Sequence, residues 1–300
     1  MKVFCILNDR SGSAGQADQH SLAQLFAQHG LLVDFLKIEG GTLVKDLVQQ
    51  AIDQHCDVIV AGGGDGTINA VAGALIAQPS IRLGVLPLGT LNHFARDLGM
   101  PTDIAQAVDI ICAGHSKAID VGLVNDHYFL NNSSVGLYPA MVKLRETLQR
   151  GGYSKWWAAL LSSLRILGRF RRFDLEVQPS NGPFIKRKTP LLFVGNNAYE
   201  TTVAKLGSRV ALDRGLLWVT LPTPSTRIGF FMGLLALVLR REKPQDTVIF
   251  EATSLKVISR KRVLTVATDG EVLRLKPPLN YSILPGALNV IVPRPDHKTK

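Results

Sequence analysis

A run of glycines between an apolar segment and an amphipathic segment constrains the fold of this chain more than any other feature. Residues 57–61, Asp-Val-Ile-Val-Ala, are apolar after the initial aspartate and rich in β-branched side chains, which predicts a buried strand. Glycines occupy positions 62–64, and apolar residues then recur at helical spacing from Ile68 to Ala77. A strand that enters a helix through glycines leaves backbone N–H groups accessible to a ligand at the helix N-terminus. This junction therefore predicts a phosphate-binding turn.

Two side chains in this turn suit a nucleotide phosphate. Asp65 supplies a carboxylate that can hold Mg²⁺ on the phosphate, and Thr67 is expected to be the helix N-cap or a hydroxyl donor. A plain tight turn is the alternative interpretation. Because a carboxylate among four glycines is a poor choice for a plain turn, we favour phosphate binding.

Strand and helix patterns alternate through the first 125 residues. The expected strands cover residues 3–7, 32–38, 58–61 and 83–87, and the expected helices cover residues 16–29, 43–54, 68–77, 91–98 and 104–113. Such alternation predicts a parallel sheet with helices on both faces, and ligands bind at the carboxyl ends of its strands. Three of these ends carry polar or glycine residues, at 8–12, 62–67 and 87–92. We expect them to line one nucleotide-binding crevice.

The pattern changes after Asp120. Short strand-like runs now dominate, at residues 128–130, 173–177, 191–194, 216–221, 248–250, 254–259, 264–268 and 288–292. Turn-forming residues separate several of these runs, which predicts a second, mainly antiparallel β-sandwich domain. We therefore expect a nucleotide-binding α/β domain at 1–125 and a β-rich domain at 126–284, with 285–300 a candidate to return to the first domain.

Composition narrows the class of protein. A hydrophobic fraction of 46% and a charged fraction of 19% over 300 residues indicate a folded chain with ample core. The three cysteines are widely spaced in apolar sequence, which indicates buried thiols rather than disulfides, and the histidines show no zinc-ligand spacing. The longest uncharged apolar run, 228–239, is shorter than the about 20 residues that a membrane span needs. We expect a cytoplasmic protein whose net charge of +10 favours phosphates, nucleic acids or anionic membranes.

Two expected helices interrupt the β pattern, at 154–170 and 226–239. Between Lys143 and Arg172 there are eight basic residues and one acid, and Trp156 and Trp157 lie within this basic segment. A basic helix with tryptophans and an apolar face suits a peripheral position on an anionic membrane. Packing of the apolar face on the sandwich is the alternative, and both interpretations remain open.

Three motifs point to one family. They are Gly-Gly-Asp-Gly-Thr at 63–67, Pro-Leu-Gly-Thr-Leu-Asn-His-Phe-Ala-Arg at 87–96 and Thr-Asp-Gly-Glu at 268–271. In this order they resemble the diacylglycerol kinase catalytic-domain family, in its soluble bacterial lipid kinase branch, which is related to the sphingosine kinases. The resemblance covers essentially the whole chain. It implies an ATP- and Mg²⁺-dependent kinase that phosphorylates a lipid hydroxyl, such as that of diacylglycerol, in a cleft between two domains.

The resemblance also implies roles for individual residues. The residues implied to bind ATP are Asn8, Ser11, Gly12, Gly63, Gly64, Asp65, Gly66, Thr67, Asn69, Thr90 and Asn92. Glu271 is implied to be the general base, with Asp120 assisting and Asp65 holding Mg²⁺. Without the resemblance, Asp269-Gly270 would be interpreted as an ordinary hairpin turn.

The chain departs from the family pattern on the acceptor side. His93 stands where many members have an aspartate, and Asn196-Asn197 precede a stretch that is often glycine-rich. The family holds a structural Mg²⁺ through an aspartate before a glycine, and here Arg214 occupies that position. Since a guanidinium cannot ligate a metal, either Asp213 substitutes or this metal site is absent.

Two rival functions remain from the sequence. An NAD kinase-like enzyme shares the first glycine motif but has no need of tryptophans in a basic helix. A non-catalytic lipid- or nucleotide-binding regulator would explain His93 and Arg214. The basic segment has no recognisable nucleic-acid motif, and the sequence leaves the lipid undefined.

Overall fold

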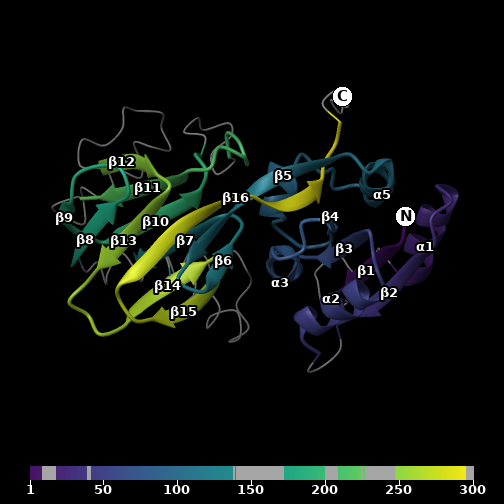
Figure 1. Cartoon of the computed structure of the whole chain (residues 1–300), viewed down its shortest axis with the longest axis horizontal. Coiled ribbons are helices and arrows are strands. Elements are labelled where there is room, and N and C mark those ends of the chain that lie inside the picture. The colour runs from purple at the N-terminus through teal and green to yellow at the C-terminus, as the bar shows by residue number, and fades with distance from the viewer. Residues whose placement is uncertain are drawn as a thin grey trace. The chain divides into compact units, whose positions relative to one another are not determined.

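A computed structural model describes residues 1–8, 18–38, 42–137, 139, 172–199, 209–223, 226 and 247–294. The chain divides into two compact units, Met1–Val121 with Pro285–Lys300, and Gly122–Leu284. Figure 1 shows the elements of each unit. Ser11, Gly12, Trp156 and Trp157 lie outside the described residues, as do the expected helices at 154–170 and, beyond Thr226, at 226–239.

The first unit is built on a parallel sheet. Its strands are β1 (Val3–Leu7), β2 (Val33–Lys37), β3 (Val58–Gly63) and β4 (Arg82–Pro87), in the order β2-β1-β3-β4. Its helices are α1 (Gln19–Gln28), α2 (Val44–Asp53), α3 (Asp65–Leu75), α4 (His93–Asp97) and α5 (Ile104–Ala113). Helix α2 packs beside α3 and α1 beside α5, which is the two-faced cover that right-handed crossovers produce. The expected α/β architecture is confirmed.

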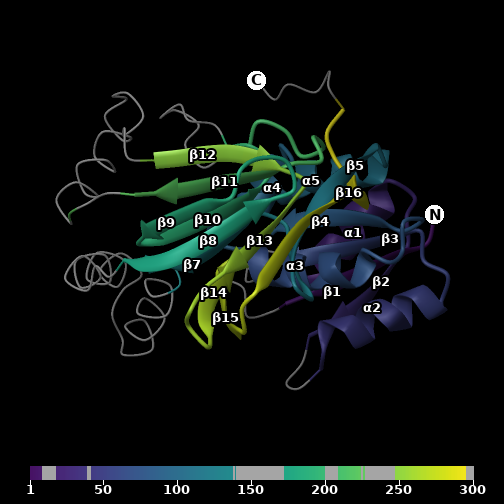
Figure 2. The same cartoon turned by 60° about the vertical axis from the view of Figure 1, so that its left-hand side comes forward.

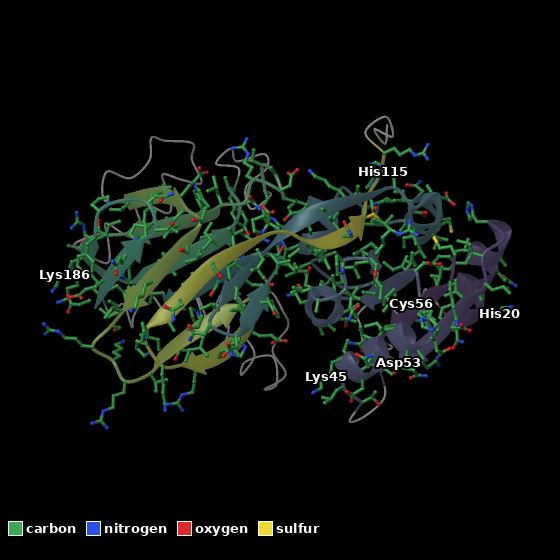
Figure 3. The ribbon with its side chains drawn as sticks, in the orientation of Figure 1. His20, Lys45, Asp53, Cys56, His115 and Lys186 are labelled. Carbon is green, nitrogen blue, oxygen red and sulfur yellow. The ribbon has the colours of Figure 1, made fainter. Side chains whose placement is uncertain are left out.

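Burial patterns explain why these segments form these elements. Every residue of β1 and β3 is buried, as expected for strands covered by helices on both faces. Helix α2 buries Leu47, Val48 and Ala51, while Lys45 and Asp53 lie on its exposed face (Figure 3). The helix is therefore held by its apolar stripe.

The strand order creates a switch point between β1 and β3. The chain leaves β1 for β2 on one side of the sheet and leaves β3 for β4 on the other. In register, Leu7 pairs with Gly62 and Gly63 pairs with Pro87, so the carboxyl ends of β1, β3 and β4 are adjacent. Ligands of open α/β sheets bind at such a point.

The second unit is an antiparallel sandwich. One sheet has the order β12-β11-β10-β7-β14-β15, and β8, β9, β13 and the first part of β16 pair in the other (Figure 2). The strands are β6 (His127–Phe129), β7 (Asn132–Gly136), β8 (Phe173–Pro179), β9 (Ile185–Thr189), β10 (Leu191–Asn196), β11 (Leu217–Pro222), β12 (Thr247–Ala252), β13 (Ser254–Ile258), β14 (Leu264–Thr268), β15 (Glu271–Leu275) and β16 (Leu279–Ile291). Residues of both sheets form one buried core, which includes Val194, Val219, Val177 and Val257. The predicted sandwich is confirmed.

Several strands were not predicted. They are β5 (Ser116–Val124), β7, β9 and β15, and β16 begins at Leu279 instead of 288. Strand β7 is rich in serine, and β9 carries three consecutive cations, so neither shows an apolar run. Lys186 lies at the outer edge of its sheet (Figure 3), and its Nζ is 2.8 Å from Glu176 Oε1. Cations on an edge strand hinder pairing with another chain.

The three cysteines lie in the described part of the chain, and none forms a disulfide. Cys5 and Cys56 are buried as expected, but Cys112 is only partly buried. Burial raises the pKa of each thiol, and that of Cys112 reaches about 11. The thiols are therefore protonated and poorly nucleophilic at neutral pH.

Candidate active site

The glycine turn leads directly into a helix that begins earlier than predicted. Helix α3 starts at Asp65, and Gly64 is its N-cap with φ −85° and no side-chain cap bond. Of the two roles expected of Thr67, that of N-cap is therefore wrong, because Thr67 is the third residue of the helix, and that of hydroxyl donor stays a prediction. A glycine cap offers no side-chain oxygen; Thr67 N donates to the Gly64 carbonyl (3.0 Å), and no side chain caps the N–H groups of Asp65 and Gly66, which suits them to a ligand or to water.

Thr67 instead joins the start of α3 to the end of β1. Asn8 Nδ2 donates to Thr67 Oγ1 (3.0 Å), and Asn8 N donates to the Gly62 carbonyl (3.0 Å). A Cβ on Gly63 would lie 2.7 Å from the Thr67 side chain. Glycine at 63 is thus required for this side chain to lie against the turn, and Asn8 is held beside the start of α3.

The second glycine loop closes onto the first. Asn92 adopts a left-handed conformation with φ 48°. Its Oδ1 accepts from Gly89 N (2.9 Å), and its Nδ2 donates to the carbonyls of Pro87 and Gly89 (3.0 Å each). A Cβ on Gly89 would lie only 2.5 Å from the Gly64 Cα. Asn92 therefore shapes the loop that presents the exposed Thr90, and Gly89, which the sequence did not single out, permits the close approach.

Asp65 and Asn69 lie four residues apart on α3 and so share a face of the helix. The Asp65 Oδ1 accepts from Phe94 N (3.2 Å) at the start of α4, a position where helix dipoles favour a carboxylate. The Asn69 Oδ1 is buried without a hydrogen-bond partner among the described residues. Since buried polar atoms are normally satisfied, this oxygen is suited to accept a hydrogen bond from a water or a ligand group. Opposite Gly66, the space that a Cβ would enter is empty to 4 Å.

Glu271 is the first residue of β15, at a two-residue hairpin. Asp269 and Gly270 have φ of 48° and 91°, and Thr268 pairs with Glu271 across the turn. These angles are those of a type I′ turn, which Asp-Gly favours. The predicted turn is confirmed, and the Glu271 side chain is exposed. It belongs to the second unit, whereas Asn8, Asp65, Thr67 and the two glycine loops belong to the first.

The Asp269 carboxylate does not face solvent as in a simple turn. It accepts three backbone N–H bonds, from Leu130 (2.6 Å), Asn131 (2.8 Å) and Asn132 (2.9 Å). Burial raises its pKa to about 6, and these N–H groups and the charge of Arg209 oppose the rise. Sequence reasoning missed this role, because the partners lie far away in the chain.

Asp120 lies on β5 with 2% of its surface exposed. Its Oδ1 accepts from Gly286 N (3.0 Å), where β16 has a positive φ of 59°. This bond holds β16 at its glycine. The catalytic role that the resemblance implies for Asp120 stays a prediction.

The stretch at 212–216 is where the family resemblance implies a structural Mg²⁺, and whether Asp213 holds one stays a prediction. Asp213 and Arg214 are both exposed, and Arg214 N donates to Asn197 Oδ1 (3.0 Å). Among the described residues, no group of three or more His, Cys, Asp or Glu is placed to hold a metal. Asp213 alone is a weak ligand set for Mg²⁺, which prefers an octahedral shell.

Comparison with known proteins places this arrangement in context. Residues 2–124 match the model of the diacylglycerol kinase catalytic domain. A diacylglycerol kinase of Staphylococcus aureus (strain bovine RF122 / ET3-1) is 29% identical over 253 residues, which are 82% of this chain and 77% of that protein. The structure of a diacylglycerol kinase from Bacillus anthracis str. Sterne aligns with TM-score 0.71, 22% identity and 97% coverage of both chains. A second structure from that strain aligns with TM-score 0.75 and 24% identity, again over 97% of each chain. These two solved structures share the fold.

Proposed function

We propose that this chain, a lipid kinase of the diacylglycerol kinase catalytic-domain family, phosphorylates a lipid hydroxyl. The phosphoryl donor in this proposal is the γ-phosphate of ATP, and Mg²⁺ assists the transfer. Diacylglycerol and related lipids are the acceptors that best agree with the relatives' names. The three lines of support are the loops at the switch point, the hairpin that carries Glu271, and the excess of positive charge.

The contact between Gly64 and Gly89 is the observation that carries this proposal. It brings the N-terminus of α3 and the Thr90 loop together at the carboxyl ends of β3 and β4. Backbone N–H groups at a helix start, with no Cβ at 63, 64 or 66, are suited to the oxygens of a nucleotide phosphate. Phosphoryl transfer depends mainly on such positioning.

The acceptor step needs a base. The lipid hydroxyl oxygen forms a bond to the γ-phosphorus while the bond from that phosphorus to the β-phosphate oxygen breaks and ADP leaves. The hydroxyl proton passes to a Glu271 carboxylate oxygen and from there to solvent. An exposed carboxylate on a fixed hairpin is a suitable proton acceptor.

Asp65 is the residue that would hold Mg²⁺, with Asn69 on the same helix face to bind a ligand or water beside it. The bound ion would neutralise phosphate charge. We expect Asp65→Ala to weaken Mg·ATP binding by about 10- to 100-fold, because one charged oxygen ligand is lost. Isothermal calorimetry measures this change directly, and an unaltered Mg·ATP affinity would contradict the assignment.

Membrane contact is part of the proposal. Within the residues that the structure covers, no helix is long and apolar enough to cross a bilayer. A cytoplasmic enzyme acting on lipid would instead bind peripherally, through the basic segment 143–172 with Trp156 and Trp157. Flotation with vesicles that contain or lack anionic lipid tests this. Equal recovery with both vesicle types would contradict an electrostatic contact.

One assay tests the function as a whole. The purified chain is incubated with γ-labelled ATP, Mg²⁺ and a total lipid extract, and in parallel with NAD. We expect label in a phosphorylated lipid and none in the nucleotide. Label confined to the NAD reaction would instead identify an NAD kinase-like enzyme, and ATP binding without turnover would identify a regulator.

A further inference from the structure

The segment Leu130–Asn132, just before and at the start of β7, is a hub of hydrogen bonds in the second unit. Its three consecutive N–H groups all donate to the carboxylate of Asp269. Oδ2 accepts from Leu130 (2.6 Å), and Oδ1 accepts from Asn131 (2.8 Å) and Asn132 (2.9 Å). In return, Asp269 N donates to the Asn132 carbonyl (2.9 Å). The hairpin tip is therefore attached to this segment through four bonds.

The carbonyl groups of the same segment are bound from other parts of the chain. The Leu130 carbonyl accepts from Asn196 Nδ2 (2.8 Å) and Arg209 Nη1 (2.5 Å). The Asn131 carbonyl accepts from Asn196 N (2.9 Å) and the Tyr199 hydroxyl (2.9 Å). Arg209 Nη2 also reaches Asn131 Oδ1 (3.4 Å). Both sides of these peptide groups are thus occupied.

The two charges in this network complement each other. Arg209 is a cation with only 8% of its surface exposed, and a buried charge is tolerated only when it is paired and hydrogen-bonded. Asp269 supplies the opposite charge on the N–H side of the Leu130–Asn131 peptide group, whose carbonyl accepts from Arg209. Peptide groups held between an anion and a cation are polarised in one direction, which strengthens each bond.

This arrangement exceeds what a two-residue turn requires. A type I′ turn needs two residues that tolerate positive φ, and Asn-Gly serves at least as well as Asp-Gly. The hairpin at Asn125-Asp126, between β5 and β6, shows a lighter attachment: Asn125, which corresponds to Asp269 in the turn, exchanges two bonds of 2.9 Å with Asn280, and its side chain accepts only one N–H. The carboxylate of Asp269 has a further effect, which is to fix the tip of the hairpin from which Glu271 projects.

We propose that Asp269 is a positioning residue for phosphoryl transfer, and that it acts with Arg209 by clamping Leu130–Asn132 so that Glu271 is held in one orientation. The inference rests on the proposed function, in which Glu271 accepts the hydroxyl proton. Asp269 itself touches no reacting atom. Its contribution is preorganisation, and a displacement of about 1 Å at a catalytic group can cost about 100-fold in rate.

The variant Asp269→Asn tests the carboxylate contacts of Asp269 while preserving the two-residue turn. Asparagine keeps the preferred turn sequence but has only one acceptor oxygen, and its NH₂ group faces a backbone N–H donor. We expect kcat for lipid phosphorylation to fall about 10- to 100-fold with the ATP KM within about twofold of wild type. Asp126→Asn is the control, because it makes the same chemical change at an exposed carboxylate in another hairpin of the second unit, and we expect it to retain wild-type kcat.

A double variant distinguishes positioning from general loss of structure. In a Glu271→Gln background the group to be positioned is gone, so adding Asp269→Asn should change the residual kcat by less than about twofold. A loss of the same size in both backgrounds would overturn the inference, as would a wild-type kcat for Asp269→Asn. An inactive wild-type enzyme would overturn the proposed function and this inference together.

Arg209→Lys provides an independent check. Lysine keeps the charge but cannot reach the Leu130 carbonyl and Asn131 Oδ1 with a rigid fork. We expect a kcat-specific loss smaller than that of Asp269→Asn, again absent in the Glu271→Gln background. Circular dichroism confirms that each variant is folded, and a folded Arg209→Lys enzyme with wild-type kcat would overturn the role of Arg209.

Discussion

The glycine turn at 62–67 and the hairpin at 268–271 are both short turns that combine glycine with an aspartate after a buried strand, yet they use these residues in opposite ways. In the first, glycines bring the backbones of Gly64 and Gly89 together, and the N–H groups at the start of α3 have no side-chain cap. In the second, positive φ angles form the turn, and the Asp269 carboxylate binds three N–H groups of another segment. The difference teaches that a helix start without a side-chain cap suits a ligand site, whereas N–H groups bound by a buried carboxylate indicate a structural support.

The largest expected effect concerns the hairpin. Glu271→Gln removes the proton acceptor, so the rate of phosphate transfer should fall by about 100- to 10,000-fold. Affinity for ATP should stay within about twofold, because the switch-point loops are unchanged. Single-turnover assays and calorimetry measure the two quantities, and a variant with wild-type turnover would show that Glu271 is not the base.

The free energy of unfolding should depend on pH through the buried carboxylate of Asp269. The pKa of Asp269 is raised to about 6 from an ordinary 3.8, so the folded state binds this proton more tightly than the unfolded state does. Its contribution is therefore complete below about pH 4 and is lost as pH rises through about 6, which removes up to about 3 kcal/mol from the free energy of unfolding. Asp269→Asn should reduce this change in the free energy of unfolding between pH 4 and 6.5. Denaturant titrations measure it, and curves of unfolding free energy against pH that run parallel for wild type and variant would contradict the prediction.

Gly89→Ala should disturb the contact between the two loops at the switch point, those of Gly64 and Gly89. The added methyl group would lie 2.5 Å from the Gly64 Cα and 2.6 Å from Asn92 Oδ1, and backbone atoms cannot move aside cheaply. We expect a loss of about 1–3 kcal/mol in the free energy of unfolding together with weaker ATP binding. Thermal unfolding tests the first part. A variant as stable as wild type would contradict the close approach of the two loops.

Gly66→Ala and Gly73→Ala form a matched pair on α3, since a Cβ meets nothing within 4 Å at either position. Each alanine should stabilise the helix by up to about 1 kcal/mol. Only Gly66→Ala should raise the KM for ATP, by roughly tenfold, because a methyl group there enters the space expected for a phosphate. Equal KM values for the two variants would remove Gly66 from the site.

The sequence was informative where the structural cause is local. The apolar runs of β1, β3 and β4, the glycines that follow them and the turn at Asp269-Gly270 each act through neighbouring residues, and all were predicted. The start of α3 was missed because a glycine cap has no side-chain signal. Strand β9 was missed because cations occupy an edge strand.

Long-range contacts lay beyond sequence reasoning. Asp269 binds a segment more than 130 residues earlier, and Arg209 binds the same segment from the connection between β10 and β11. No local pattern distinguishes Asp269 from any Asp-Gly turn, since the property that matters is which N–H groups its carboxylate meets. No sequence pattern predicts that the Asn69 Oδ1 is buried without a hydrogen-bond partner among the described residues.

The path of β16 has a consequence for synthesis of the protein. The first unit is discontinuous, because Pro285–Lys300 belongs to it while the second unit is inserted between. Strand β4 obtains its partner on this side only when Val290 pairs with Leu83. During translation from the N-terminus, the first unit must therefore wait, with a sheet edge uncovered, until the inserted unit has left the ribosome. Such an edge invites pairing between nascent chains, and it is covered only by a strand that is made after the inserted unit.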